Sequence, residues 1–228
     1  MTTASNQFRY ERKLIAPGLS PAEVVALVRQ HPAMFRETYP ERAVNNLYLD
    51  TPDLRHYTDH VNGSAHRVKV RIRWYGDFAG RIERPVMEFK TKRGLVSGKV
   101  AHPLRPMSLN GGWPQATFPA VLKESALPDA ATVHLHGLAP ALANHYQRRY
   151  FCSASGIRLT LDWALRFYDA RHSSRWQAVA PHGSLGVIIE LKYDLAKAEA
   201  AVRVANAFPF RLTRCSKYVL GIQCLNAV

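Results

Sequence analysis

Hydrophobic and polar residues alternate with a period of two along much of the chain, and this pattern predicts a protein rich in β-strands. The strands expected from it cover residues 8–15, 44–49, 66–75, 86–92, 98–103, 143–152, 157–168 and 186–193. Short turns such as Ser155-Gly156 join several of them, so neighbouring strands should run antiparallel. The expected fold class is α+β, with a sheet large enough to curl into a closed antiparallel barrel of about eight strands.

Helices are expected outside this barrel. Ser20 followed by Pro21 and Glu23 has the spacing of a capping box, which predicts a helix over residues 20–30. Two more are expected at 195–208 and 216–225, a turn or short helix at 51–62, and an irregular region at 107–131 with one short helix near 120–125. The chain contains no internal repeat and no low-complexity linker, so residues 1–228 are expected to form a single domain.

The formal net charge of +14, from 31 Lys and Arg against 17 Asp and Glu, predicts an anionic partner. Nucleic acid, a phosphate-rich small molecule and a membrane surface all satisfy this charge. The sequence has no apolar run of about 20 residues and no signal-peptide core, which indicates a soluble, cytoplasmic protein. Its three cysteines lack zinc-site spacing and are expected to be buried thiols.

The strand at residues 66–75 reads H-R-V-K-V-R-I-R-W-Y and places a cation at every second position. Arg67, Lys69, Arg71 and Arg73 therefore share one face, while Trp74 belongs to the apolar face and is expected in the core. Four neighbouring cations repel each other. Such a face must either lie in bulk water or bind a polyanion.

Charged residues recur at the same two-residue spacing on other predicted strands. They are Glu11 with Lys13, Glu88 with Lys90 and Lys92, Glu190 with Lys192, and Arg158 with Thr160 and Asp162. A polar face of an open sheet could simply be solvated, but exposed faces usually mix Ser, Thr and Gln with their charges. A barrel with a charged lumen explains the strands together. Guanidinium and ammonium groups would bind phosphates there, and carboxylates would hold a divalent cation.

Seven segments of the chain, in order, match the motifs of a known family. They are F-R-Y-E-R-K-L, K-V-R-I-R-W-Y-G, E-F-K-T-K-R, Y-Q-R-R-Y-F, I-R-L-T-L-D, I-I-E-L-K-Y and S-K-Y-V-L-G-I. Over residues 8–222 the chain resembles the VTC (vacuolar transporter chaperone) catalytic domain. That domain is a polyphosphate polymerase of the triphosphate tunnel metalloenzyme superfamily.

This resemblance implies a metal-dependent enzyme whose tunnel of eight antiparallel strands binds a nucleoside triphosphate such as ATP and a polyphosphate chain, with Mn²⁺ or Mg²⁺. It implies no nucleic-acid partner, and export of the product would need a membrane partner protein. The catalytic and phosphate-binding residues that it implies are Lys13, Arg71, Arg73, Lys90, Arg148, Arg158 and Lys217. Glu190 would be the metal-binding carboxylate.

Two features depart from related tunnel enzymes. Arg9 stands where the E-x-E-x-K motif of tunnel phosphatases and cyclases has its first glutamate, which favours the VTC branch with its one main acidic ligand. The sequence also has no phosphate-sensing helical domain and no membrane segment, both of which accompany this domain in the eukaryotic complex. Regulation and product transport are therefore expected to come from other proteins.

Alternatives remain for the function and for single residues. A tripolyphosphatase or nucleoside triphosphatase of the same fold would use water as acceptor, and a non-catalytic module would bind RNA or polyphosphate. Asp162 is either a second metal ligand or the partner of Arg158 in an ion pair. His56 and His60 have helical spacing but no third ligand, so a surface role is favoured over zinc binding.

Overall fold

The computed structural model describes residues 10–94, 96–110, 117–171, 177–181 and 185–226. The strands are β1 (Tyr10–Ala16), β2 (Arg36–Asp50), β3 (His66–Tyr75), β4 (Gly80–Ile82), β5 (Val86–Arg93), β6 (Val96–Pro103), β7 (Met107–Leu109), β8 (Ala139–Cys152), β9 (Arg158–Asp169), β10 (Ala178–Val179) and β11 (Val187–Tyr193). The helices are α1 (Pro21–Gln30), α2 (Arg55–Val61), α3 (Thr117–Glu124), α4 (Asp129–Val133), the 3₁₀ turn η1 (Leu195–Lys197), α5 (Ala198–Asn206) and α6 (Lys217–Asn226).

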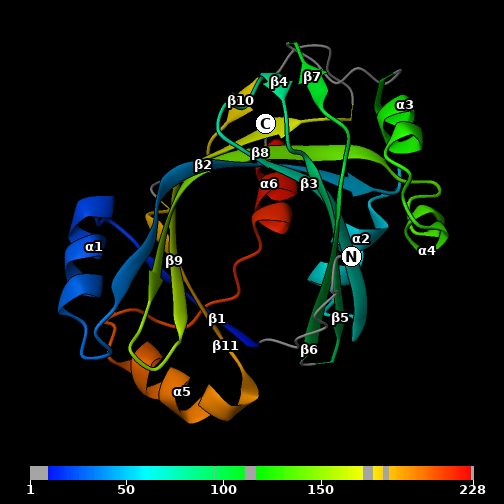
Figure 1. Cartoon of the computed structure of the whole chain (residues 1–228). Coiled ribbons are helices and arrows are strands. Elements are labelled where there is room, and N and C mark those ends of the chain that lie inside the picture. The colour runs from blue at the N-terminus through cyan, green and yellow to red at the C-terminus, as the bar shows by residue number, and fades with distance from the viewer. Residues whose placement is uncertain (1–9, 95, 111–116, 172–176, 182–184, 227–228) are drawn as a thin grey trace.

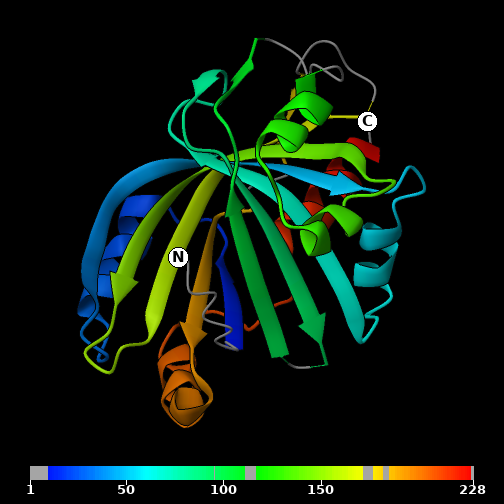
Figure 2. The same ribbon diagram turned by 45° about the vertical axis from the view of Figure 1, so that its right-hand side comes forward.

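One large antiparallel sheet dominates the molecule, with the strand order β1-β11-β9-β8-β2-β3-β5-β6 and with β10 paired to β9. The sheet bends into a deep arch, with β2 and β8 at its crest (Figures 1 and 2). A second, two-stranded sheet pairs β4 with β7. The α+β class with a large antiparallel sheet and helices outside is confirmed.

Closure of the sheet into a barrel is not confirmed. Strands β1 and β6 are the two edges of the sheet, and within the described ranges no backbone pairing joins them. Leu212 forms an isolated bridge with Leu14 of β1, and the side chain of Glu11 on β1 meets that of Lys90 on β5. Barrel closure depends on strand tilt and register, which residue alternation does not specify. The register between β2 and β8 shifts at several points, and such shifts change the curvature of a sheet.

Helices α1 and α5 pack on the convex side of β1, β9 and β11 (Figure 1). In α1, Ser20 and Glu23 form the predicted capping box, and Val24 and Val28 are fully buried against the sheet. A second apolar cluster lies outside β3 and β5 and contains Trp74, which confirms its predicted core position. The convex face is therefore covered by apolar packing, which leaves the charged positions of these strands on the concave side.

The C-terminal helix α6 lies inside the arch (Figure 1), where Tyr218 and Ile222 are buried in a third apolar cluster. The buried carboxylate of Asp50 ties this helix to α2. It accepts hydrogen bonds from the backbone N–H of His56 and Tyr57, at 2.8 and 3.0 Å, and from the Tyr218 hydroxyl. Helix α6 therefore fills one part of the concave side and leaves the remainder to polar side chains.

Some boundaries differ from the sequence-based predictions. Strand β2 begins at Arg36, eight residues before the predicted start at 44. The prediction missed its first half because that half is exposed and lacks apolar alternation. The irregular region contains two short helices, α3 and α4, instead of one. Phe8 and Arg9, predicted to open the first strand, lie outside the described residues.

Candidate functional site

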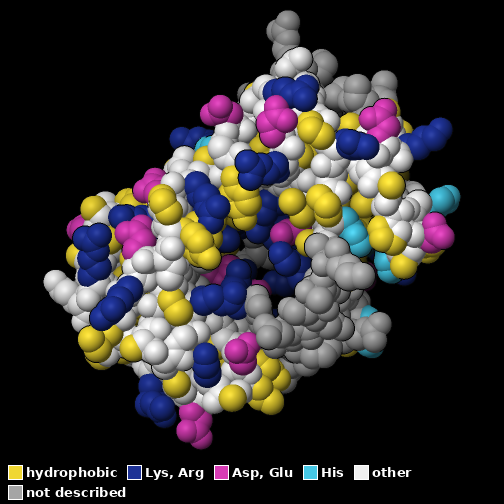
Figure 3. All heavy atoms as spheres, viewed as in Figure 1, with side chains coloured by type: hydrophobic (Ala, Val, Ile, Leu, Met, Phe, Trp, Pro, Cys, Tyr) yellow, Lys and Arg dark blue, Asp and Glu magenta, His cyan; other side chains and the backbone are white. Residues whose placement is uncertain are grey.

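Charged and polar side chains from eight strands meet on the concave side of the sheet. We define the concave face by Lys13, Glu190, Asp162, Arg148, Arg71, Arg73, Glu88 and Lys90 together with their cross-strand neighbours of the same orientation. Figure 3 shows Lys and Arg side chains gathered, with a few carboxylates, around a hollow in the molecule. The alternation recognised along separate strands thus becomes one continuous surface, because directly opposed residues on paired strands point the same way.

The predicted arginine pair on β3 is held by a buried glutamate. Arg71 donates to Glu88 from Nε and Nη2, at 2.8 and 2.7 Å, and Arg73 Nη1 lies 3.8 Å from the same carboxylate. Lys99 on β6 adds a third cation at 2.9 Å. Burial raises the pKa of Glu88, but the three cations lower it by a larger amount. The net pKa of this carboxyl lies well below its ordinary value, so it is ionised at neutral pH. The result is a cationic cluster with a single negative centre.

A second cluster surrounds Asp162, which is fully buried. Arg148 donates to both of its carboxylate oxygens, at 2.5 and 2.7 Å, and Lys217 at the start of α6 donates at 2.5 Å. Asp162 therefore already has two cationic partners. The structure shows its pairing with Arg148, whereas the sequence suggested either Arg158 or a metal.

Glu190 on β11 lies between two lysines. Lys192 Nζ is 3.1 Å and Lys13 Nζ 3.8 Å from its carboxylate, and Lys13 also donates to the backbone carbonyl of Cys215 at 2.8 Å. Burial raises the pKa of Glu190, but Lys192 and Lys13 outweigh burial and keep it well below its usual range. Glu190 is therefore an ionised carboxylate at neutral pH, as a metal ligand must be.

The surroundings of Glu190 fit a hard divalent cation shared with a substrate. The register places Thr160 opposite Glu190 and Tyr150 opposite Thr160. Both hydroxyls are buried, and neither has a hydrogen-bond partner among the described residues. Among the described residues, no group of three or more His, Cys, Asp or Glu side chains could hold a metal ion alone. Mg²⁺ and Mn²⁺ sites on phosphate substrates commonly use one or two carboxylates and take further oxygens from phosphate and water. Glu190 matches that type of site.

All eight predicted site residues lie on strands or at a helix start beside this hollow. Lys90 donates to Glu11 at 2.6 Å across the gap between β5 and β1. Arg158 lies opposite Lys192 and is exposed, so it belongs to the rim of the face.

Sequence analysis missed several polar residues that hold these cations. Asn46 accepts a hydrogen bond from Arg73 Nε at 2.8 Å and donates to Asn144 at 2.8 Å. The ring of Tyr146 lies under Lys217 and Arg148, at 4.7 and 5.2 Å from its centroid. These residues lie on the same face of their strands as predicted site residues. Tyr146, for example, is two positions before Arg148, and this spacing could have identified it.

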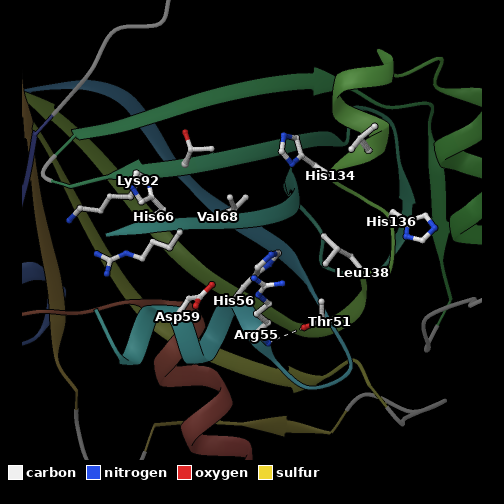
Figure 4. Close-up of a pocket in the computed structure, with 13 residues that line it drawn as sticks. Thr51, Arg55, His56, Asp59, His66, Val68, Lys92, His134, His136 and Leu138 are labelled. Carbon is white, nitrogen blue, oxygen red and sulfur yellow. Dashed lines mark hydrogen bonds between the residues drawn. The ribbon is translucent and has the colours of Figure 1, made fainter. Parts of the chain in front are cut away.

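The basic surface continues into a pocket of about 500 Å³ between α2, β3, β5 and the segment after α4. Figure 4 shows His66 and Lys92 on one side of it, with His134 and His136 on another. Arg67 also lines this pocket and shares strand parity with Arg71. Arg67 and Lys92 therefore connect the pocket to the concave face.

The family model for the VTC domain matches residues 8–226. This chain belongs to the VTC domain family. No curated protein sequence matches the chain.

Solved structures similar to this VTC domain share its fold at low sequence identity. The PH1819 protein from Pyrococcus horikoshii OT3 is 13% identical with a TM-score of 0.53, and the match covers 94% of this chain and 98% of that one. HpAC1 from Hippeastrum, an adenylyl cyclase candidate with a dominant triphosphatase activity, is 14% identical with a TM-score of 0.52 and 95% coverage of both chains. At these identities the likenesses show a shared fold and no more. None of the described helices has the length and apolarity that crossing a membrane requires.

Proposed function

We propose that this VTC domain is a metal-dependent polyphosphate polymerase that transfers the γ-phosphoryl group of ATP to the end of a polyphosphate chain. The observation that carries the proposal is the concave face itself. It combines the Arg71 and Arg73 pair with lysines from other elements and with the ionised carboxylate of Glu190. Thr160 lies opposite Glu190, and its hydroxyl has no hydrogen-bond partner among the described residues. Membership in the VTC domain family supports the same activity.

The cations of the concave face suit a linear chain of phosphates. They come from β1, β3, β5, β8, β9 and α6 and include Lys13, Arg71, Arg73, Lys90, Arg148, Arg158 and Lys217. Guanidinium groups bind phosphate oxygens in pairs, and lysines act as point charges. A substrate phosphate would compete with Glu88 for Arg71, so binding exchanges one anionic partner for another and leaves little buried charge uncompensated.

The reaction needs no nucleophilic side chain. A terminal oxygen of the polyphosphate chain attacks the γ-phosphorus, a new P–O bond forms, and the bond to the β-γ bridging oxygen breaks, with ADP as leaving group. Arg71, Arg73 and Lys13 would orient the two phosphate groups and neutralise their mutual repulsion. Bound through Glu190, Mn²⁺ or Mg²⁺ would supply further charge neutralisation at the phosphate oxygens.

Two other functions use the same surface. A triphosphatase would direct water instead of phosphate at the γ-phosphorus, and the triphosphatase activity of HpAC1 keeps this alternative in view. A polyanion-binding module would need the cations alone. Glu190, whose charge Lys192 and Lys13 already offset, would have no role in simple binding, whereas in an enzyme it would hold the metal ion.

The test is incubation of the protein with ATP and Mn²⁺, followed by gel electrophoresis and treatment with exopolyphosphatase. We expect long polyphosphate from the native protein and a loss of at least about 100-fold for Glu190→Ala, the scale seen when a main electrostatic group is removed. Glu37→Ala is the matched control, because Glu37 pairs with Arg149 at a partly exposed position away from Glu190.

Release of orthophosphate without polymer would replace the polymerase by the triphosphatase. Inactive native protein that still binds polyphosphate, with Glu190→Ala binding equally well, would support the binding module instead.

A further inference from the structure

Lys69 on β3 is a half-buried lysine of the concave face, and neither of its two side-chain partners is a carboxylate. Lys69 Nζ donates a hydrogen bond to the Ser216 hydroxyl at 2.8 Å and lies 3.5 Å from Nε2 of His60 on α2. Both partners are neutral groups when His60 is unprotonated. Within the described residues, Lys69 forms no ion pair with a carboxylate.

Five other lysines around this face pair with carboxylates, whereas Lys92 and Arg67, like Lys69, form no ion pair among the described residues. Lys13 and Lys192 share Glu190, Lys90 pairs with Glu11, Lys99 with Glu88, and Lys217 with Asp162. A buried cation without a counter-ion is costly, because burial removes its hydration and gives nothing in return. An unpaired lysine at this position is therefore best explained by an anion that is supplied from outside.

The charges that face Lys69 come from every element around it. Lys13 on β1, Lys90 on β5, and Arg71 and Arg67 on its own strand are all cationic. Burial first, and then these four cations, lower the pKa of Lys69 to about 6.

On the side of α2, burial and then Lys69 lower the pKa of His60 to about 3. His60 therefore stays neutral and supplies no compensating charge. In the empty site at neutral pH, Lys69 is mainly an uncharged amine.

We propose, on the basis of the polyphosphate-binding function above, that Lys69 contacts the phosphate chain and takes up one proton from solvent when the chain binds. The amine becomes an ammonium, and the new charge is paired with phosphate oxygen. Ser216 and His60 hold the side chain in place in both states. Lys69 thereby couples occupancy of the concave face to pH.

The sign of this coupling follows from linkage. Below about pH 6, Lys69 is already charged in the empty site and binding needs no proton. Above that pH, each binding event must recruit one, so affinity falls as pH rises, by up to about tenfold per pH unit. Lys69 thus favours phosphate binding at the acidic side of neutrality.

The experiment is isothermal titration calorimetry of tripolyphosphate into the full-length protein between pH 6 and 8, in buffers of different ionisation enthalpy. The dependence of the heat on the buffer gives the protons taken up per ligand. Lys69→Arg keeps a permanent charge, since arginine is not deprotonated in proteins. Lys69→Met removes the charge, and Lys123→Met on the exposed surface of α3 is the control.

We expect uptake to be lower by about one proton at pH 7.5 to 8 in both Lys69 variants than in the native protein and the control. Lys69→Arg should still bind at pH 8, whereas Lys69→Met should bind about tenfold or more weakly. Protonation of tripolyphosphate itself is common to all four proteins and cancels in the difference.

Equal proton uptake in native protein and Lys69→Met would overturn the proposal. Circular dichroism would check folding of the variants, and a difference in uptake between native protein and Lys69→Arg that stays unchanged between pH 6 and 8 would also contradict the proposal. Failure of the native protein to bind tripolyphosphate at all would instead refute the proposed function.

Discussion

Arg148 and Lys217 depend on one fully buried carboxylate, Asp162. Loss of this carboxylate would leave two buried cations without a counter-charge. We expect Asp162→Ala to lower the free energy of unfolding by about 3–5 kcal/mol, the range for breaking a buried ion pair. Urea denaturation measures this change, and Glu83→Ala, which breaks an exposed pair with Arg81, should cost about 1 kcal/mol or less.

The same residue predicts a pH dependence. Burial raises the pKa of Asp162, but Arg148 and Lys217 lower it more, to about 2. Its folded-state pKa lies below its unfolded value, so its contribution is present above about pH 4 and is lost as pH falls towards 2. Native protein should lose more stability over this window than Asp162→Ala. Parallel loss in both proteins would contradict the assigned pairing.

Single residues also show how far strand alternation extends. It placed Asp162 on the polar face of a predicted strand, whereas Arg148 was implied by the family resemblance. It did not pair them, since they come from different strands and meet only through the β8–β9 register. Residues such as Asn46 and Tyr146 were missed because a lone amide or phenol on a strand is too common to mark a site.

At the scale of elements, α6 determines how much of the concave side remains open. A Cβ atom on Gly221 would lie 2.5 Å from Leu142 Cδ2 and 2.6 Å from Phe167 Cδ1, so α6 sits close to β8 and β9. We expect Gly221→Ala to destabilise the protein by about 1–3 kcal/mol through overpacking, partly offset by about 1 kcal/mol of helix propensity.

Thermal unfolding tests this, with Gln223→Ala on the exposed side of α6 as control. Stabilisation of Gly221→Ala by as much as its helix propensity gain would show that α6 can shift freely. In that case α6 would not be a fixed wall of the site.

Elements with a strong local signal were predicted well. The capping box defined α1, and alternation defined β3 and β5 within one residue of their observed ends. The first half of β2 was missed, because exposed strands without alternation are stabilised by their pairing with β8 rather than by their own pattern.

For the whole molecule, the net charge of +14 is compatible with polyphosphate and with nucleic acid as partner. The curvature of the sheet leads to different expectations for the two. If the concave face binds phosphate chains as proposed, we expect tripolyphosphate to pair with its buried cations and folded or stacked RNA to contact exposed charges. At 100 times its Kd, tripolyphosphate should stabilise the fold by about 2.7 kcal/mol and raise Tm by roughly 5–10 °C.

Differential scanning fluorimetry in 0.15 M salt measures this shift. Single-stranded RNA at equal phosphate concentration should give a smaller shift that disappears faster with added salt, since exposed contacts are screened most. An equal or larger shift with RNA, unchanged in Glu190→Ala, would favour the nucleic-acid-binding alternative.

The sequence by itself determined which side chains share a face, because alternation along a strand is a local property of the backbone. It also determined the family, through motifs spread over nearly the whole chain. Only the tertiary structure decided which charges pair and that the described sheet stays open between β1 and β6. It also decided that Lys69 has no carboxylate partner among the described residues. These depend on register, curvature and the path of the segment before α6, which bring together residues far apart in the chain.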